Sequence, residues 1–153
     1  MAIRNVVQEG DEILRKVCKP VEEFDERLFK LLDDMKDTVK KERGAGLAGP
    51  QIGVLKRVCV VDVDEGYFEF INPKIVAVKG KQKGVEGCLS VRHKQGYVTR
   101  PNVVTMQYQD RNGTPHEITA TGFFARACCH ETDHLDGGIY TDKVIEFDSQ
   151  EEE

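Results

Sequence analysis

The most regular hydrophobic pattern in the chain lies between residues 25 and 42. Its apolar residues recur at the three- and four-residue spacing of one helix face: Leu28, Leu31, Leu32, Met35 and Val39. Asp25 stands in front of this run as an N-cap, and cations gather at its far end, where they suit the helix dipole. Gly44 can take the left-handed position after the last turn. The pattern predicts an amphipathic N-terminal helix over about 25–42.

The segments on either side of this helix have different patterns. Residues 3–19 hold short apolar groups broken by a polar stretch, which indicates an arm with one helical turn that ends at Pro20. After the helix, short β-branched or alternating runs are separated by close turns, including one at 80–84. These runs are 57–63, 67–73, 75–78, 103–108 and 116–121. Short strands with close turns favour antiparallel pairing, so the chain is predicted to be α+β.

A second helix is indicated near the C-terminal end, after Gly122 and before the pair Gly137-Gly138. Its stripe at i, i+4, i+7 and i+11 consists of Phe123, Ala127, His130 and His134. Two histidines therefore share a face with apolar residues, which indicates a site buried in the core. We expect antiparallel sheets packed around this helix.

The two histidines belong to a His-Glu-x-x-His sequence, which is typical of a metal site. Residues four apart on a helix point the same way, so both imidazoles can bind one ion. Glu131 stands beside that ion and is placed to act on a bound water. A simpler interpretation of such a pair is that both histidines are ordinary surface residues that bind no metal. The glutamate, the apolar stripe and a third candidate ligand count against it.

The third candidate ligand is Cys88, between the turn residues Gly87 and Ser90, where we expect a loop that reaches the helix. A single cysteine is more often a small buried apolar residue than a ligand. Cys59 lies in the middle of a predicted strand, so we interpret it as a residue that packs in the core. Cys128 and Cys129 adjoin His130 but point elsewhere around the helix, so they read as core or as support for the ligands.

The stretch 44–53 is a glycine-rich loop that contains two apolar residues and Gln51. A connector is the simple interpretation. A backbone without side chains also lets a ligand approach closely, and Gln51 offers it a neutral amide. No Gly-Lys-Ser/Thr follows, so this is not a phosphate-binding P-loop.

Length, net charge and the distribution of apolar residues restrict the class of protein to which the chain can belong. The 153 residues fit one domain, expected over 1–147, with an acidic tail over 148–153 that we expect to be disordered. The net charge of −5 offers no basic field for nucleic acid. No apolar run matches a bilayer span or a signal-peptide core, so we expect a cytoplasmic protein with reduced thiols and no membrane partner.

Three stretches together resemble the signature motifs of one family. Residues 44–51 (Gly-Ala-Gly-Leu-Ala-Gly-Pro-Gln), 86–90 (Glu-Gly-Cys-Leu-Ser) and 130–134 (His-Glu-Thr-Asp-His) are similar in order and spacing to those of the peptide deformylases. The resemblance covers essentially the whole chain. It implies a metal-dependent hydrolase that removes the formyl group from formyl-methionine at the start of new polypeptides.

The resemblance also implies roles for individual residues. Cys88, His130 and His134 would bind the metal, which is Fe²⁺ in the family and is often replaced by Zn²⁺ or Ni²⁺. Glu131 would be the catalytic acid and base. The remaining site residues would be two oxyanion donors, Gln51 and the Leu89 N–H, a peptide-pairing backbone at Ala45, Gly46 and Gly87, and a methionine pocket lined by Phe123, Arg126 and Ala127. The implied partners are N-formyl-methionyl peptides, nascent chains and the ribosome.

At three positions the residue differs from the one that is common in the family. Other functions also remain open at this point. Gly49 stands where alanine is common, Arg92 where proline is common, and Cys129 where glutamine is common. A zinc endopeptidase fits the histidine motif, but no histidine follows His134 to complete its ligands. A non-catalytic metal-binding homologue would need neither Glu131 nor Gln51. A redox sensor at Cys128 and Cys129 is disfavoured, because neighbouring cysteines on a helix rarely bridge.

Overall fold

The computed structural model describes residues 2–148, so residues 149–153 of the predicted acidic tail lie outside it. These described residues contain two long helices and eight strands, with three short 3₁₀ helices. The helices are α1 (Glu26–Lys41) and α2 (Gly122–Leu135). The strands are β1 (Gly46–Ala48), β2 (Val58–Val63), β3 (Gly66–Lys79), β4 (Gln82–Cys88), β5 (Val91–Arg100), β6 (Val103–Gln109), β7 (Pro115–Thr121) and β8 (Glu146–Phe147).

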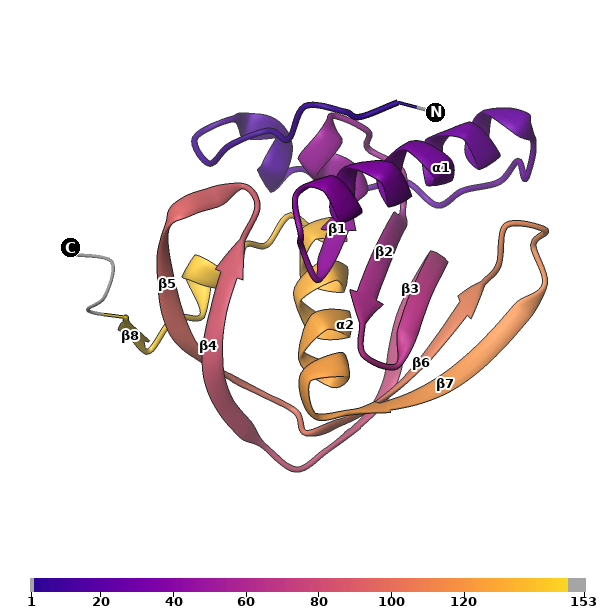
Figure 1. Ribbon diagram of the computed structural model, residues 1–153. Helices are drawn as coiled ribbons and strands as arrows, with labels where there is room; N and C mark the ends of the chain where they lie inside the picture. The colour runs from indigo at the N-terminus through magenta and orange to yellow at the C-terminus, as the bar shows by residue number, and fades with distance from the viewer. Residues whose placement is uncertain (1, 149–153) are drawn as a thin grey trace.

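The strands form two antiparallel sheets, as the α+β prediction requires. The larger sheet has the order β1-β2-β3-β6-β7, and the smaller has the order β4-β5-β8. Helix α2 lies between the two sheets and contacts strands of both, while α1 packs over β1 and β2 (Figure 1). The antiparallel sheets and the C-terminal helix are therefore confirmed, and they place the helix with the two histidines at the centre of the molecule.

Helix α1 is confirmed almost over its predicted length. The Asp25 side chain accepts a hydrogen bond from the Leu28 N–H at 3.1 Å, as an N-cap should. The prediction that Gly44 follows the last turn was wrong by one residue. Glu42 is the C-cap, and Arg43 takes the left-handed conformation, with φ of 55°.

Three predictions about strands and turns were also wrong. Residues 67–73 and 75–78 lie in one continuous strand, β3. The strand contains an irregularity here: Asn72 has a φ of 52°, and the pairing with β6 shifts register between Ile71 and Lys74. The expected turn at 80–84 is shorter, since β4 begins at Gln82. Strands β4 and β5 were both missed, because polar residues hide their strand pattern. Cys88 ends β4 instead of lying in a loop.

The core consists of three clusters of buried apolar side chains. One fills the space between α2 and the larger sheet and includes Cys59, Cys128 and Cys129. These three cysteines are free and buried, as expected of packing residues. A second cluster lies under α1, and a third joins the N-terminal arm to β5 and to the segment after α2. No helix of the described chain is long and apolar enough to span a membrane.

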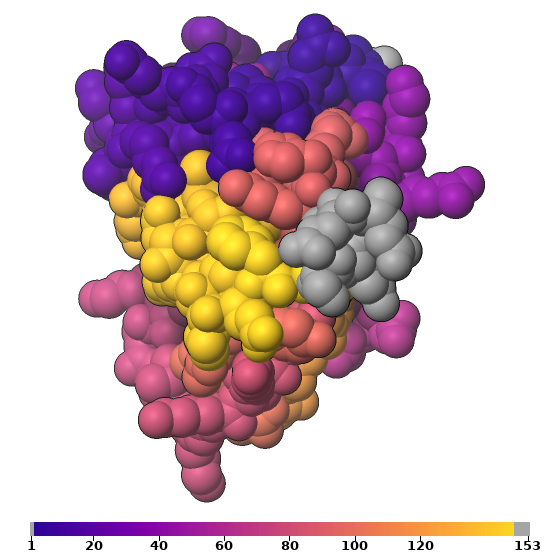
Figure 2. Space-filling model, turned by 90° about the vertical axis from the view of Figure 1, so that its left-hand side faces the viewer, coloured from indigo at the N-terminus to yellow at the C-terminus, as the bar shows by residue number. Residues whose placement is uncertain are grey.

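The N-terminal arm contacts both the glycine-rich segment and the hairpin that carries Cys88. Figure 2 shows the N-terminal segment lying against the hairpin formed by β4 and β5. The Val7 N–H donates to the Gln51 carbonyl at 2.7 Å, and the Glu9 N–H donates to the Ser90 carbonyl at 2.8 Å. The arm thus fixes the glycine-rich segment relative to the hairpin.

Replacing Leu32 with alanine tests the packing of α1. This side chain is fully buried in the second cluster. We expect Leu32→Ala to lower the free energy of unfolding by about 2–5 kcal/mol, because a cavity remains after the side chain is removed. Urea unfolding followed by circular dichroism measures the change. The control is Val17→Ala, at a side chain that is 66% exposed, where we expect less than about 0.5 kcal/mol. Equal losses in both variants would contradict this packing.

Candidate metal centre and active site

The structure brings Cys88, His130 and His134 together. Their ligand atoms all lie within 4.8 Å of one another, and Cys88 Sγ is 3.4 Å from His134 Nε2. Cys88 comes from the end of β4 and the histidines from successive turns of α2. Metal–nitrogen and metal–sulfur bonds of about 2.1 and 2.3 Å put tetrahedral ligand atoms about 3.6 Å apart. The cluster therefore fits a divalent ion with a thiolate and two imidazoles.

The pKa shifts of His130 and His134 are both compatible with binding one divalent metal ion. Burial lowers the pKa of His134 well below its usual value, so its imidazole is neutral and can act as a ligand. Burial also opposes charge on His130, but hydrogen bonds with Cys88 and Glu86 raise the pKa of His130 well above its usual value. These partners therefore favour a cation at His130, and a metal ion can replace the proton.

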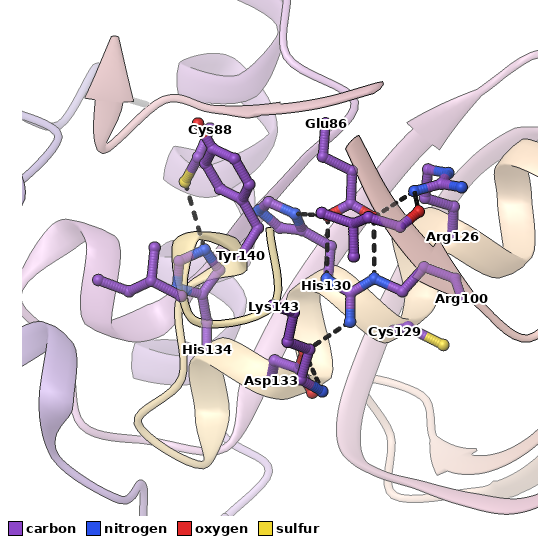
Figure 3. A network of polar contacts seen from close by, with 12 residues as sticks. Glu86, Cys88, Arg100, Arg126, Cys129, His130, Asp133, His134, Tyr140 and Lys143 are labelled. Atoms are coloured by element: carbon purple, nitrogen blue, oxygen red, sulfur yellow. Dashed lines mark hydrogen bonds and ion pairs between the residues drawn. The ribbon is translucent and has the colours of Figure 1, made fainter. Parts of the chain in front are cut away.

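Glu86 is the main residue of this region that sequence reasoning missed. Its Oε1 lies 2.9 Å from His130 Nδ1, which leaves Nε2 of that ring for the metal (Figure 3). Arg100 donates to both Glu86 oxygens at 2.8 and 2.9 Å, and Arg126 donates to Oε2 at 2.7 Å. Burial would raise the pKa of Glu86, but Arg100 and His130 hold it well below its usual range. The sequence carries no signal for this network, because the arginines lie 14 and 40 residues away.

Further residues hold the ligands in place. Arg100 also donates to Asp133 at 2.7 Å, so the carboxylate next to His134 belongs to the same network (Figure 3). The Tyr140 ring stacks on the His130 ring with 5.9 Å between centroids. Sequence reasoning also missed this contact, because Tyr140 follows α2 after the chain has turned back at Gly137. The ring restricts the orientation of His130.

Glu131 projects from α2 toward Gly46. Its side chain is buried, and its Oε1 has no hydrogen-bond partner within residues 2–148. Burial raises the pKa of Glu131 to about 7, while the charge of His130 acts in the opposite direction. A carboxyl group with a pKa near neutrality can both accept and release a proton under physiological conditions.

Gln51 lies beside the cluster with a fixed amide. Its Oε1 accepts from the Ala48 N–H at 2.9 Å, and its Nε2 donates to Ser90 Oγ at 3.1 Å. The same Nε2 lies 3.5 Å from Cys88 Sγ. The amide N–H groups therefore face the ligands. Ser90 is fully buried, and its contact with Gln51 was another feature that the sequence did not reveal.

Leu89 follows Cys88 in the turn between β4 and β5. Its carbonyl accepts from Gln8 Nε2 at 3.0 Å, so the N-terminal arm supports this turn. Over the described range 2–148, its backbone N–H has no acceptor. The N–H is available to a ligand next to Cys88.

A cavity of about 390 Å³ brings most of the predicted site residues to one surface. Its lining includes Gln51, Cys88, Leu89, His130 and Glu131, and also Ala45, Gly46, Gly87, Phe123, Arg126 and Ala127. His134 does not line it and is fully buried. One part of the sequence interpretation needs correction. Phe123, the first residue of the predicted buried stripe, is 59% exposed and lies at the lip of the cavity.

Two sheet edges border this cavity. β1 is the outer strand of the larger sheet and β4 is the outer strand of the smaller one. Ala45 and Gly46 lie on the first edge, and Gly87 lies on the second. An extended peptide can therefore pair with one or both edges as an added strand.

The three residues that differ from those common in the family lie in different structural surroundings. A Cβ at Gly49 would lie 2.6 Å from the Val54 carbonyl oxygen, so this segment as folded requires glycine. Arg92 lines the cavity, and its Nη1 pairs with Glu42 Oε1 at 2.9 Å. Burial raises the pKa of the Cys129 thiol to about 11, so it is an unreactive packing residue.

Comparison with known proteins identifies the family. The family model described as polypeptide deformylase matches residues 3–150. A peptide deformylase of Caldicellulosiruptor bescii is 54% identical over 152 residues, covering 99% of this chain and 92% of the relative. The crystal structure of the Legionella pneumophila peptide deformylase superposes with a TM-score of 0.90 at 43% identity, covering 93% of this chain and 86% of that one.

A second solved structure agrees over nearly its whole length. The peptide deformylase of Thermotoga maritima superposes with a TM-score of 0.91 at 36% identity, covering 93% of this chain and 97% of that one. The chain therefore belongs to the peptide deformylase family, hydrolases that remove the N-formyl group from the first methionine of new polypeptides.

Proposed function

We propose that Cys88, His130 and His134 hold one divalent metal ion, with Fe²⁺ as the native ion and Zn²⁺ or Ni²⁺ as substitutes. The observation that carries this proposal is the convergence of the three ligand atoms within 4.8 Å. One thiolate with two imidazoles suits all three metals. When bound, the ion supplies a Lewis acid that lowers the pKa of a water to roughly 7. Three protein ligands leave a position for that water.

Glu131 acts as the general base and then as the general acid. It accepts a proton from the attacking water and passes it to the amine that leaves as the amide C–N bond breaks, so that formate and a free N-terminus result. The pKa of about 7 supports both roles at neutral pH. The zinc endopeptidase alternative finds no support, because the three described ligands already include Cys88.

Gln51 Nε2 and the Leu89 N–H donate to the oxyanion that forms at the formyl carbon. The support is geometric: the Gln51 amide faces Cys88 at 3.5 Å, and the Leu89 N–H next to it has no acceptor within residues 2–148. Both donors are fixed before the substrate arrives, which is what electrostatic stabilisation of a transition state needs.

The substrate is an extended formyl-methionyl peptide. Its backbone pairs with Ala45, Gly46 and Gly87, and its methionine side chain enters the pocket lined by Phe123 and Ala127. Arg126 forms the wall of this pocket with its aliphatic part, because its guanidinium is bound to Glu86 and to the Val98 carbonyl. Residues 1–147 act as one catalytic unit.

The cellular setting follows from the substrate. We place the enzyme in the cytoplasm, where formyl-methionyl nascent chains are made, and include transient association with the ribosome in the proposal. Direct binding to RNA is not expected, since the net charge of −5 and the acidic C-terminal end oppose it.

Anaerobic purification with metal analysis, followed by a formate-release assay on formyl-Met-Ala, tests the proposed site. We expect one Fe²⁺ per chain and turnover in the wild type. Glu131→Gln should retain the metal and lose at least about 10²-fold in kcat, because the proton acceptor is gone while the ligands remain. Full turnover in this variant would exclude the proposed acid–base role, and turnover after complete metal removal would exclude the metal's role.

Gln51→Leu tests the oxyanion role. We expect kcat to fall by about 10²-fold or more, because one donor to the oxyanion is lost. Ser90→Ala is the comparison variant: it removes the acceptor of the amide but keeps the donor, so its loss should be smaller. Steady-state formate release measures both. An unchanged kcat in Gln51→Leu would contradict the assignment.

Gly46→Ala tests the close approach of β1 to the base. A Cβ at this position would collide with the Glu131 carboxylate. We expect the displaced carboxylate to cost about 10²-fold in kcat, as small misplacements of catalytic groups do. Metal content should stay near one ion per chain, since no ligand is touched. Wild-type kcat would show that Glu131 does not work from this position.

A further inference from the structure

Four of the described arginine and lysine residues line the cavity, and three of them have acidic partners. Arg126 pairs with Glu86 at 2.7 Å. Arg92 pairs with Glu42 at 2.9 Å, and Lys94 Nζ lies 3.7 Å from Glu9 Oε1. Arg43 also lines the cavity, but no carboxylate within residues 2–148 pairs with it. Among the described arginine and lysine residues that line the cavity, Arg43 is therefore the one without an acidic partner.

The backbone holds Arg43 in a conformation that favours glycine. Its φ of 55° places it in the left-handed region, directly after the C-cap of α1. Residues with side chains are uncommon there, and those observed often lie near functional sites. The chain then continues through Gly44 to Ala45 and Gly46, which form one wall of the cavity. Arg43 thus begins the wall along which we place the substrate.

We propose that Arg43 binds an acidic side chain at the third residue of the substrate, so that formyl-Met-Xaa-Asp and formyl-Met-Xaa-Glu peptides are preferred. This inference rests on the proposed pairing of the peptide with the cavity wall. Gly46 abuts Glu131 and so marks the position of the formyl end. Arg43 stands three residues before Gly46, at a turn that leads through Gly44 and Ala45 into β1, and both residues line the same cavity. An antiparallel peptide that starts beside Glu131 runs along this wall toward Arg43, and we assign its third residue to that side chain.

The surrounding charges make this preference local. The chain as a whole carries a net charge of −5, so it does not attract acidic peptides in general. A neighbouring depression shares Phe123 with the cavity and is lined by Asp62, Asp64 and Glu65. Arg43, Arg92 and Lys94 line the cavity, whereas the three carboxylates line the neighbouring depression. A substrate carboxylate is therefore favoured in the cavity and disfavoured in the depression.

Three peptides of one length test the proposal: formyl-Met-Ala-Xaa-Ala amides with glutamate, glutamine or lysine as Xaa. The metal-loaded enzyme is assayed by formate release. We expect kcat/KM to follow the order Glu, Gln, Lys, with about two- to fivefold between the first and the last, as for an exposed ion pair. This ratio should shrink at about 0.5 M salt, which screens exposed charges.

Arg43→Gln and Arg43→Gly should bring the Glu-to-Lys ratio close to one. The glycine variant also relieves the left-handed backbone, so it guards against a folding defect in the glutamine variant. The matched control is Arg27→Gln, which removes the same charge from an exposed residue at the other end of α1 and should keep the wild-type ratio.

A wild-type ratio of one, or a ratio that both Arg43 variants retain, would overturn the inference while leaving the deformylase function intact. Failure to release formate from all three peptides would instead overturn the proposed function, and this inference with it.

Discussion

The buried carboxylate of Glu86 is the interaction on which the rest of the site depends. It lies on β4 and receives hydrogen bonds from Arg100 on β5 and from Arg126 on α2, and it also contacts His130. Removing one partner of a buried ion pair typically costs about 3–5 kcal/mol, because the remaining charge stays buried without compensation. The network therefore ties the smaller sheet to the central helix. Because Cys88 is two residues from Glu86, the same network sets the distance from the thiol to the histidines.

A second set of contacts fixes the other side of the site. The N-terminal arm binds the backbone of both the glycine-rich segment and the hairpin turn through Val7, Gln8 and Glu9. Gln51 then bridges from the first of these segments to Ser90 in the second. Each contact alone is a modest hydrogen bond of about 1 kcal/mol. Together they orient two donors toward one point before a substrate binds, which is how preorganised sites work.

The division into two sheets places two strand edges beside one cavity. Open sheet edges are usually shielded, because they pair with other chains. Here β1 and β4 present their edges to one cavity, with α2 between the two sheets (Figure 1). Both edges therefore lie where an extended peptide could add a strand. In the proposed function, α2 supplies two metal ligands and the base, and the two edges bind the extended substrate.

The sequence by itself determined the local features of this protein. The spacing of Leu28 to Val39 specified α1, and His130 with His134 specified a shared helix face, because helical periodicity depends only on neighbouring residues. Motif spacing also singled out Cys88 and Gln51. Only the tertiary structure showed that Cys88 ends a strand and that Arg43, not Gly44, takes the left-handed position. It also showed that two arginines donate hydrogen bonds to Glu86. These features depend on contacts between residues far apart in the chain, and no local periodicity records such contacts.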